Sequence, residues 1–164
     1  MRNSFLVLIG LLSVAACSTT SPNRLVYSSG FSFANYDYVV IAKPDGGNTH
    51  TSLYGMDVEF ANLMSRYNMK VLGQNEYASL SDSNRLRTLF ARMAATASDD
   101  YITLSVSFDD AVSGRTGASI TGSAEGDIFE YGDRSEVFES VSETVIRALT
   151  SDKQLQIADD VVRK

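Results

Sequence analysis

The sequence predicts a small two-layer α/β domain with a mixed sheet, in the order β-α-β-α-β-β-α, preceded by a cleaved signal and a flexible tether. Three observations carry this prediction. Hydrophobic residues recur every three or four positions in three segments, which is typical of helices with one buried side. Hydrophobic and polar residues alternate in two later segments, which is typical of strands with one buried face. The length of 164 residues suffices for one domain with its own core.

Residues 1–16 have the features of a secretion signal. Arg2 precedes an apolar stretch of about twelve residues, which is too short to cross a bilayer core of roughly 30 Å. The run Val14-Ala15-Ala16-Cys17 resembles the lipobox of bacterial lipoproteins. The resemblance implies cleavage between Ala16 and Cys17, and lipid, including palmitate, on the Cys17 thiol. The alternative is a plain secretory signal with an incidental cysteine.

Residues 17–32 are predicted to form the lipidated tether. They are rich in serine and threonine and contain Pro22 and Gly30, as flexible linkers often do. In Gram-negative lipoproteins the residue after the cysteine influences sorting, and Ser18 is not the aspartate of inner-membrane retention. The resemblance therefore implies the outer membrane, at its periplasmic face, with the membrane itself as a partner through Cys17.

Charge and cysteine content exclude several classes of protein. The formal charge is -6 and no Lys/Arg cluster occurs, so nucleic acid is not an expected partner. Cys17 and His50 are the single cysteine and the single histidine. An internal disulfide, a Cys/His zinc site, a thiol nucleophile in the domain and a His-based triad are therefore not expected. No cofactor is predicted.

The predicted domain covers residues 33–150, and its first half contains two β-α-β passages. A strand is expected at 36–43, where unbroken apolarity indicates burial on both faces. A helix over 53–67 and a strand over 70–72 follow. A second helix is predicted over 85–97, after the N-cap cluster at 81–84. Its apolar stripe comprises Leu86, Leu89, Phe90, Met93 and Ala97.

The second half of the domain is predicted to be a hairpin and a helix. Residues 102–108 and 118–128 alternate between apolar and polar, and the turn between them contains Gly114 and Gly117. The crossover rule makes the strand at 102–108 parallel to the earlier strands. The last helix is expected to begin at Asp133, with residues 151–164 extending it or fraying. Its apolar stripe comprises Phe138, Val141, Val145, Ala148 and Leu149.

The lipobox, tether and element order together resemble a group of envelope lipoproteins. The group includes activators of penicillin-binding proteins and the curli-secretion lipoprotein, whose α/β domain also resembles the N-terminal domain of TolB. Residues 63–72, LMSRYNMKVL, and residues 95–104, ATASDDYITL, carry the resemblance. It implies a non-enzymatic domain that docks on another envelope protein or joins an envelope assembly. It assigns no binding residues.

The residues with chemical potential all have ordinary structural interpretations. His50 is expected to be a solvated loop residue, and the loop at 45–48 lacks the ligand spacing of an EF-hand. The glycine- and serine-rich segment 113–127 could accept a strand from another protein, or could simply lie close to a helix. Turn and cap roles are expected for the acidic pairs Asp99-Asp100, Asp109-Asp110 and Asp159-Asp160.

We therefore expect a non-catalytic, membrane-anchored envelope protein that interacts with another protein. The alternative is a lipoprotein that binds a small molecule or glycan in an apolar pocket. Tyrosines are the candidate lining of that pocket: Tyr54, Tyr67, Tyr77 and Tyr101. A hydrolase is disfavoured, because no nucleophile motif is present.

Overall fold

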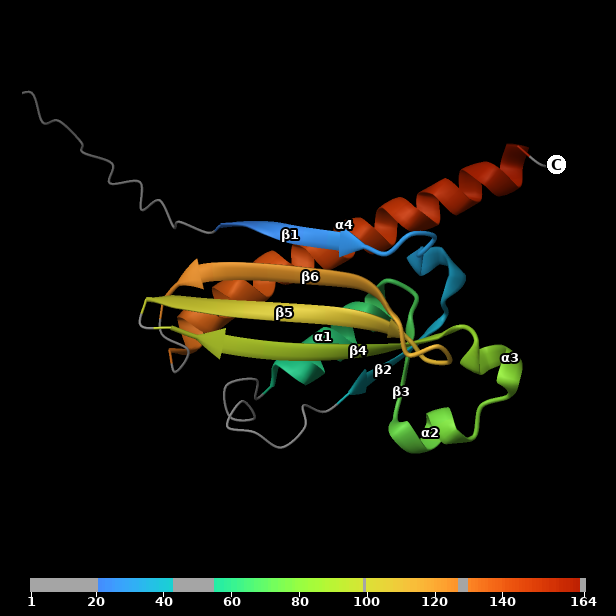
Figure 1. The fold of residues 1–164 in the computed structure, drawn as a ribbon, viewed down its shortest axis with the longest axis horizontal. Coiled ribbons are helices and arrows are strands. Elements are labelled where there is room, and N and C mark those ends of the chain that lie inside the picture. The colour runs from blue at the N-terminus through green and yellow to red at the C-terminus, as the bar shows by residue number, and fades with distance from the viewer. Residues whose placement is uncertain (1–20, 43–54, 99, 127–129, 163–164) are drawn as a thin grey trace, which may run out of the picture.

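The computed structural model describes residues 21–42, 55–98, 100–126 and 130–162. These residues form one mixed six-stranded sheet with helices, which confirms the predicted α/β class (Figure 1). The strands are β1 Ser21–Tyr27, β2 Tyr38–Ala42, β3 Lys70–Leu72, β4 Thr88–Ala97, β5 Tyr101–Asp110 and β6 Thr116–Glu125. The helices are the 3-10 turn η1 Phe33–Asn35, α1 Met56–Arg66, α2 Gln74–Ala78, α3 Asp82–Arg85 and α4 Tyr131–Val162.

The sheet has the strand order β1-β6-β5-β4-β2-β3. β2 pairs in parallel with β3 and with β4, whereas the pairs β4–β5, β5–β6 and β1–β6 are antiparallel. Helices α1 and α4 cover the same face, which lies behind the strands in Figure 1. The core therefore sits between one face of the sheet and these two helices.

Aromatic side chains from η1, α1 and β5 pack together in the core. Phe33 and Phe108 meet edge to face with ring centroids 4.9 Å apart, and Phe60 of α1 lies 6.1 Å from Phe108. The Phe33 amide also donates to Asp152 Oδ2 of α4 at 2.8 Å. The short η1 turn is thereby held between the sheet and the last helix.

The strand predicted at 36–43 is β2, and its predicted burial on both faces is confirmed. Val39 and Val40 are both completely buried, and successive residues of a strand point to opposite faces. α1 covers the Val39 side. On the other side, Tyr77 of α2 packs edge to face on Phe90, the sheet neighbour of Val40, at 5.0 Å between ring centroids.

The predicted helix at 85–97 is wrong, because residues 88–97 form strand β4. Leu89 and Met93 fit both a helical and an alternating pattern, since they lie four positions apart. The structure buries Ala91 and Ala95 as well, so the period is two. Pairing with β2 and β5 on its two sides satisfies the backbone of this segment, and that tertiary environment outweighs local propensity. The predicted cap cluster instead forms most of α3, a helix of four residues that begins after the N-cap Ser81.

The direction predicted for the strand at 102–108 is also wrong. Because β4 is a strand rather than a crossover helix, β5 follows it as the second arm of a hairpin and runs antiparallel to it. The next hairpin, β5–β6, is confirmed. Residues 151–162 continue α4 as a helix.

The predicted flexible tether is wrong from Ser21 onward, because β1 pairs with β6. The register slips between Ser21 and Arg24, which is a bulge at the one strand segment that contains a proline. The bulge lies beside Asn23, whose amide donates to Ser140 O, Ser140 Oγ and Thr144 Oγ1 of α4 at 2.7, 2.9 and 2.9 Å. This cluster connects the first strand to the last helix.

β1 also decides between the two interpretations of the glycine- and serine-rich segment 113–127, as an edge that accepts a foreign strand or as a segment close to a helix. The edge of β6 that could have received a foreign strand is occupied by β1. A Cβ on Gly122 would lie 2.7 Å from Val141 Cγ2 of α4, and one on Gly117 would overlap the Phe31 ring. Gly117 and Gly122 are therefore explained by the close approach of neighbouring elements.

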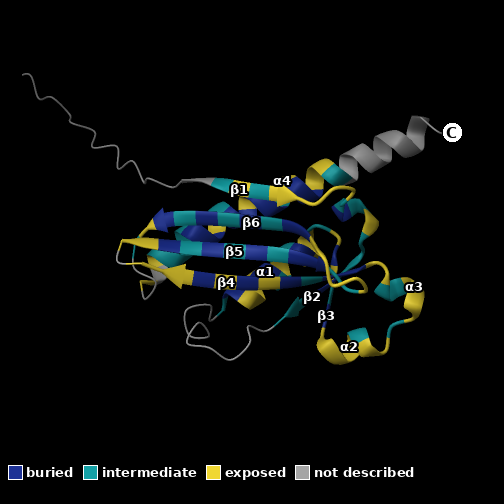
Figure 2. Ribbon diagram, viewed as in Figure 1, coloured by how far each residue is buried: buried dark blue, intermediate teal, exposed yellow. Residues whose placement is uncertain are grey.

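Buried residues of β5 and β6 alternate with partly exposed ones (Figure 2), and small hydroxyl residues occupy partly exposed positions on the face opposite α1 and α4. Thr103 and Ser123 bond across β5 and β6 at 2.8 Å, and Ser105 and Thr121 bond at 3.1 Å. These pairs stand directly opposite one another in the register and partly satisfy each other's hydroxyls.

Candidate functional site

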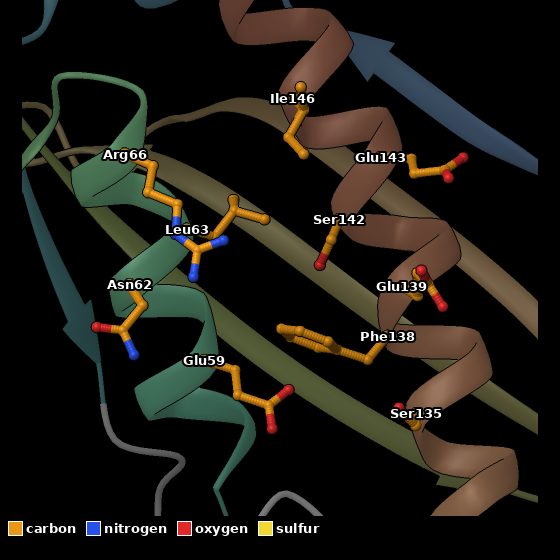
Figure 3. A pocket seen from close by; sticks show the side chains of 10 residues that line it. All are labelled: Glu59, Asn62, Leu63, Arg66, Ser135, Phe138, Glu139, Ser142, Glu143 and Ile146. Carbon is orange, nitrogen blue, oxygen red and sulfur yellow. The ribbon is translucent and has the colours of Figure 1, made fainter.

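A groove of about 530 Å³ separates α1 from α4 on the helical face of the domain (Figure 3). We call it the interhelical groove. The sheet positions the two helices, since each buries its own apolar stripe against it. The groove is lined by Glu59, Asn62, Leu63, Arg66, Ser135, Phe138, Glu139, Ser142, Glu143 and Ile146.

The floor of the groove is partly apolar. Phe138, Ser142 and Ile146 of α4 follow one another at four-residue intervals, so they share one side of the helix. Leu63 of α1 lies opposite them, and the Phe138 ring points across the gap toward α1 (Figure 3). Phe138 is only 9% exposed. A ligand here would meet the edge of a largely buried ring and two aliphatic side chains.

The rim of the groove is acidic. Glu59, Glu139 and Glu143 are exposed, and Arg66 is the one cationic side chain among the lining residues. None of the three glutamates makes a salt bridge with any described residue. Glu139 and Glu143 stand four residues apart on α4, where like charges repel by about 0.2–0.5 kcal/mol. The rim therefore carries a net negative charge that no salt bridge among the described residues neutralises.

Ser142 is the unusual residue of the floor. It is 6% exposed, and its Oγ has no hydrogen-bond partner among the described residues. Figure 3 shows the side chain directed into the groove between Leu63 and Phe138. An unsatisfied buried hydroxyl costs about 1–3 kcal/mol. The sequence stripe predicted Phe138 to be buried, but the burial of Ser142 could not be found from it.

The predicted acidic pairs take structural roles where the structure describes them. Asp109 is buried, accepts a hydrogen bond from Thr116 Oγ1 at 2.6 Å and pairs with Arg92 at 2.7 Å. Asp110 accepts from the amides of Val112 and Ser113 and from Tyr36 Oη. These contacts close the β5–β6 turn. Asp99 and the side chains of Asp159 and Asp160 lie outside the described part.

A second hollow, of about 470 Å³, lies at the opposite end of β5. Asp100, Tyr101, Glu125 and Gly126 line it, and Tyr101 Oη donates to Glu125 Oε1 at 3.2 Å. That bond and the charge of Glu125 raise the pKa of Tyr101. Within the described residues, no group of three or more acidic, histidine or cysteine side chains could hold a metal ion.

The predicted tyrosine pocket is wrong. Tyr77 donates to Ala111 O, just beyond the end of β5, whereas Tyr101 stands at the start of the same strand. A strand of ten residues spans about 30 Å, so these two rings do not converge on one ligand. Tyr67 caps α1 on the helical side of the sheet. Tyr54 lies outside the described residues.

The residues predicted for anchoring also lie outside the described part: Ala16, Cys17 and the signal before them. The same is true of His50 and the loop at 45–48. No helix among the described residues has the length and apolarity needed to cross a membrane. The described residues thus define a two-layer α/β domain with an acidic, partly apolar groove between its helices.

No family profile and no curated protein significantly matches the sequence. Among solved structures it is similar to dodecameric PelC from Paraburkholderia phytofirmans. For a point variant of PelC the identity is 18%, over 74% of this chain and 93% of that chain, with a TM-score of 0.47. For PelC in a second crystal form the identity is 13%, over 79% of this chain and 96% of that chain, with a TM-score of 0.46.

A homolog of the neuraminyllactose-binding hemagglutinin from Helicobacter pylori is also similar. Its identity is 12%, over 84% of this chain and 96% of that chain, with a TM-score of 0.42. At these values no residue of this chain takes a role from those proteins.

Proposed function

We propose that the protein is a lipid-anchored component of the bacterial envelope whose domain docks on another envelope protein and performs no catalysis. The signal is cleaved between Ala16 and Cys17, and acyl chains on Cys17 hold the protein on the periplasmic face of the outer membrane. One chain would give marginal anchoring, whereas two or three on one cysteine hold it durably. The lipobox sequence Val14-Ala15-Ala16-Cys17 is the observation that carries this proposal.

The position of β1 in the sequence limits how far the domain can lie from its anchor. Only residues 18–20 separate Cys17 from Ser21, the first residue of the sheet. Four Cα steps span at most about 14 Å even when fully extended. A lipid on Cys17 therefore keeps the domain against the membrane surface, where it meets partners that are themselves at the membrane.

The interhelical groove supports the docking part of the proposal. It contains carboxylates, hydroxyls and one guanidinium, but no thiol or imidazole that could activate a nucleophile. Its partly apolar floor and charged rim resemble the core and rim of protein interfaces.

Mass spectrometry of the mature protein tests the anchor. We expect a peptide that begins at Cys17 and carries a diacylglyceryl group, and we expect Cys17→Ser to release the protein from the membrane fraction. An unmodified cysteine in a protein that still sediments with membranes would contradict the proposal.

Photo-crosslinking in cells tests docking. A crosslinkable residue at Asn62, in the groove, should yield one discrete envelope partner. The same probe at Thr96, exposed on β4 of the other sheet face, is the control and should not yield it. An equal product from both positions would contradict docking through the groove.

A further inference from the structure

We infer that the interhelical groove receives a lysine or arginine side chain carried by a basic amphipathic helix of the partner protein. The inference rests on the proposed docking function and names the chemistry of its partner. Three independent features of the groove point to a cationic group.

The first feature is charge. Glu59 points from α1 across the groove, whereas Glu139 and Glu143 stand on the outer rim at α4, and Glu143 points away from α1 (Figure 3). No described side chain forms a salt bridge with these three carboxylates, although the Arg66 guanidinium lies in the same groove. A basic helix laid over the groove would bring one cation to Glu59 and others to the rim, where they would relieve the repulsion between Glu139 and Glu143.

The second feature is the buried serine. Ser142 Oγ lies in the floor with no hydrogen-bond partner among the described residues, and a hydroxyl oxygen can accept a hydrogen bond from an ammonium or guanidinium N–H. Oγ lies just below the surface, so an arriving donor needs a small outward turn of this side chain. The hydroxyl that is unsatisfied in the free domain then becomes part of the site.

The third feature is the apolar lining. The methylene stem of lysine or arginine is apolar and packs well on aliphatic and aromatic surface while its charged end stays with polar groups. Leu63 and Ile146 offer the aliphatic part of this surface, and the edge of the Phe138 ring offers the aromatic part. A small inorganic cation would use the carboxylates and gain nothing from this floor.

The shape of the groove favours a helix as the carrier. The lining residues of α4 run from Ser135 to Ile146, which is about 16 Å at the helical rise of 1.5 Å per residue. This length matches three turns of a third helix laid between the two. In such complexes apolar anchors at i, i+3, i+4 and i+7 enter the groove, and basic residues beside them would meet the glutamates.

A second copy of this chain does not fit the groove. Its own exposed groove residues include three glutamates, Glu59, Glu139 and Glu143, against one cation, Arg66, and its formal charge is -6. Two such faces would repel. An anionic lipid headgroup would be repelled for the same reason.

The test measures fluorescence anisotropy of labelled 18-residue peptides on the mature chain with Cys17→Ser. This variant avoids detergent, which would itself bind such peptides. One peptide carries a leucine stripe at helical spacing flanked by lysines. A second has glutamates in place of the lysines, and a third has the first composition in scrambled order. We expect the first to bind at least tenfold more tightly than either of the others.

Three variants locate the binding. Glu139→Gln with Glu143→Gln should weaken it at least fivefold. Asp100→Asn with Glu125→Gln removes the same charge at the other hollow and should leave the affinity unchanged. Ser142→Ala should weaken binding several-fold while raising the thermal midpoint of the free domain, since it removes an unsatisfied polar group.

The outcomes separate this inference from the proposed function. Equal affinity for the three peptides, equal loss in both charge variants, or self-association in sedimentation would overturn the inference. Binding of spermidine as tight as that of the lysine peptide would also overturn the helical carrier. Mass spectrometry of Cys17 tests the anchor separately, so a lipidated protein that ignores every peptide loses the groove assignment alone.

Discussion

The Asn23 side chain joins the first strand to the last helix, and its removal gives the sharpest prediction of the fold. Asn23→Ala deletes an amide whose two hydrogens serve three acceptors on α4, at 2.7 to 2.9 Å. The backbone bonds between β1 and β6 stay in place. We expect the variant to fold and β1 to open more often.

The expected magnitude follows from the contacts. A net intramolecular hydrogen bond contributes about 0.5–1.5 kcal/mol, and the cluster is only part-buried, so water can replace some of the loss. We therefore expect about 1–2 kcal/mol less stability for the pairing of β1. At about 1.4 kcal/mol per tenfold change, the opened population rises roughly 5- to 30-fold.

Hydrogen–deuterium exchange of the peptide that covers residues 23–28 measures this opening directly. Exchange there should accelerate, whereas exchange in β4 and β5 should change less, because an edge strand can open without the rest of the sheet. Asn75→Ala, at an exposed position of α2, is the control. If exchange in β1 changes no more than in this control, the cluster does not hold the strand and the reasoning is refuted.

Three further predictions follow from the same structure. Gly122→Ala should destabilise the domain by about 1–3 kcal/mol in urea unfolding, because its Cβ would overlap Asn23 Oδ1 and lie 2.7 Å from Val141 Cγ2. Gly132→Ala on α4, with open space around it, should be tolerated, and equal effects of the two substitutions would contradict the close packing at Gly122. Arg92→Ala should lower the free energy of unfolding by about 1–3 kcal/mol, since it leaves the buried Asp109 without its cation, and adding Asp109→Asn should restore part of the loss. Arg87→Ala breaks a half-exposed pair of the same 2.7 Å length with Asp37 and should cost less than about 1 kcal/mol. A larger loss in Arg87→Ala would refute the role of burial. Burial and the hydrogen bond to Asp110 raise the pKa of Tyr36 from 10.0 to about 12, so its contribution to stability is complete below pH 10 and is lost as pH rises toward 12. Plots of unfolding free energy against pH for wild type and Tyr36→Phe should therefore diverge in this window, and parallel plots would contradict the assignment.

The pH dependence at the acid end has the opposite sign. Burial by itself would raise the pKa of Asp110, but hydrogen bonds from Ser113, Tyr36 and Val112 outweigh it and lower the pKa below 3.8. A carboxylate with a lowered pKa contributes stability above its unfolded pKa, and that contribution is lost as pH falls through the folded pKa. Tyr36 and Asp110 share one hydrogen bond, and together they stabilise the fold at pH values between the lowered pKa of Asp110 and the raised pKa of Tyr36.

Periodicity predicted the elements whose burial is one-sided. The alternation in β5, where Ile102, Leu104, Val106 and Phe108 are buried, leaves one interpretation only. The stripes of α1 and α4 are equally clear, since their buried residues repeat at three and four positions. These segments carry their own structural signal, and the α/β class followed from them.

The groove could be predicted only in part. The sequence placed Phe138 on a buried stripe, yet it contains no signal that α1 and α4 lie side by side. Sequence separation hides that proximity, because residues 59–66 and 135–146 meet only when the sheet brings their helices to one face. The burial of Ser142 follows from this arrangement and from nothing local.

The sequence alone determined the lipobox prediction, the single-domain size, the mixed α/β class and the faces of the amphipathic elements, because these depend on residues close together in the chain. Only the tertiary structure decided that β4 is a strand and that the supposed tether begins the sheet. β4 has an ambiguous period, and β1 is polar and contains a proline. Each becomes a strand because a neighbouring strand satisfies its backbone, and that free energy comes from residues far away in the sequence.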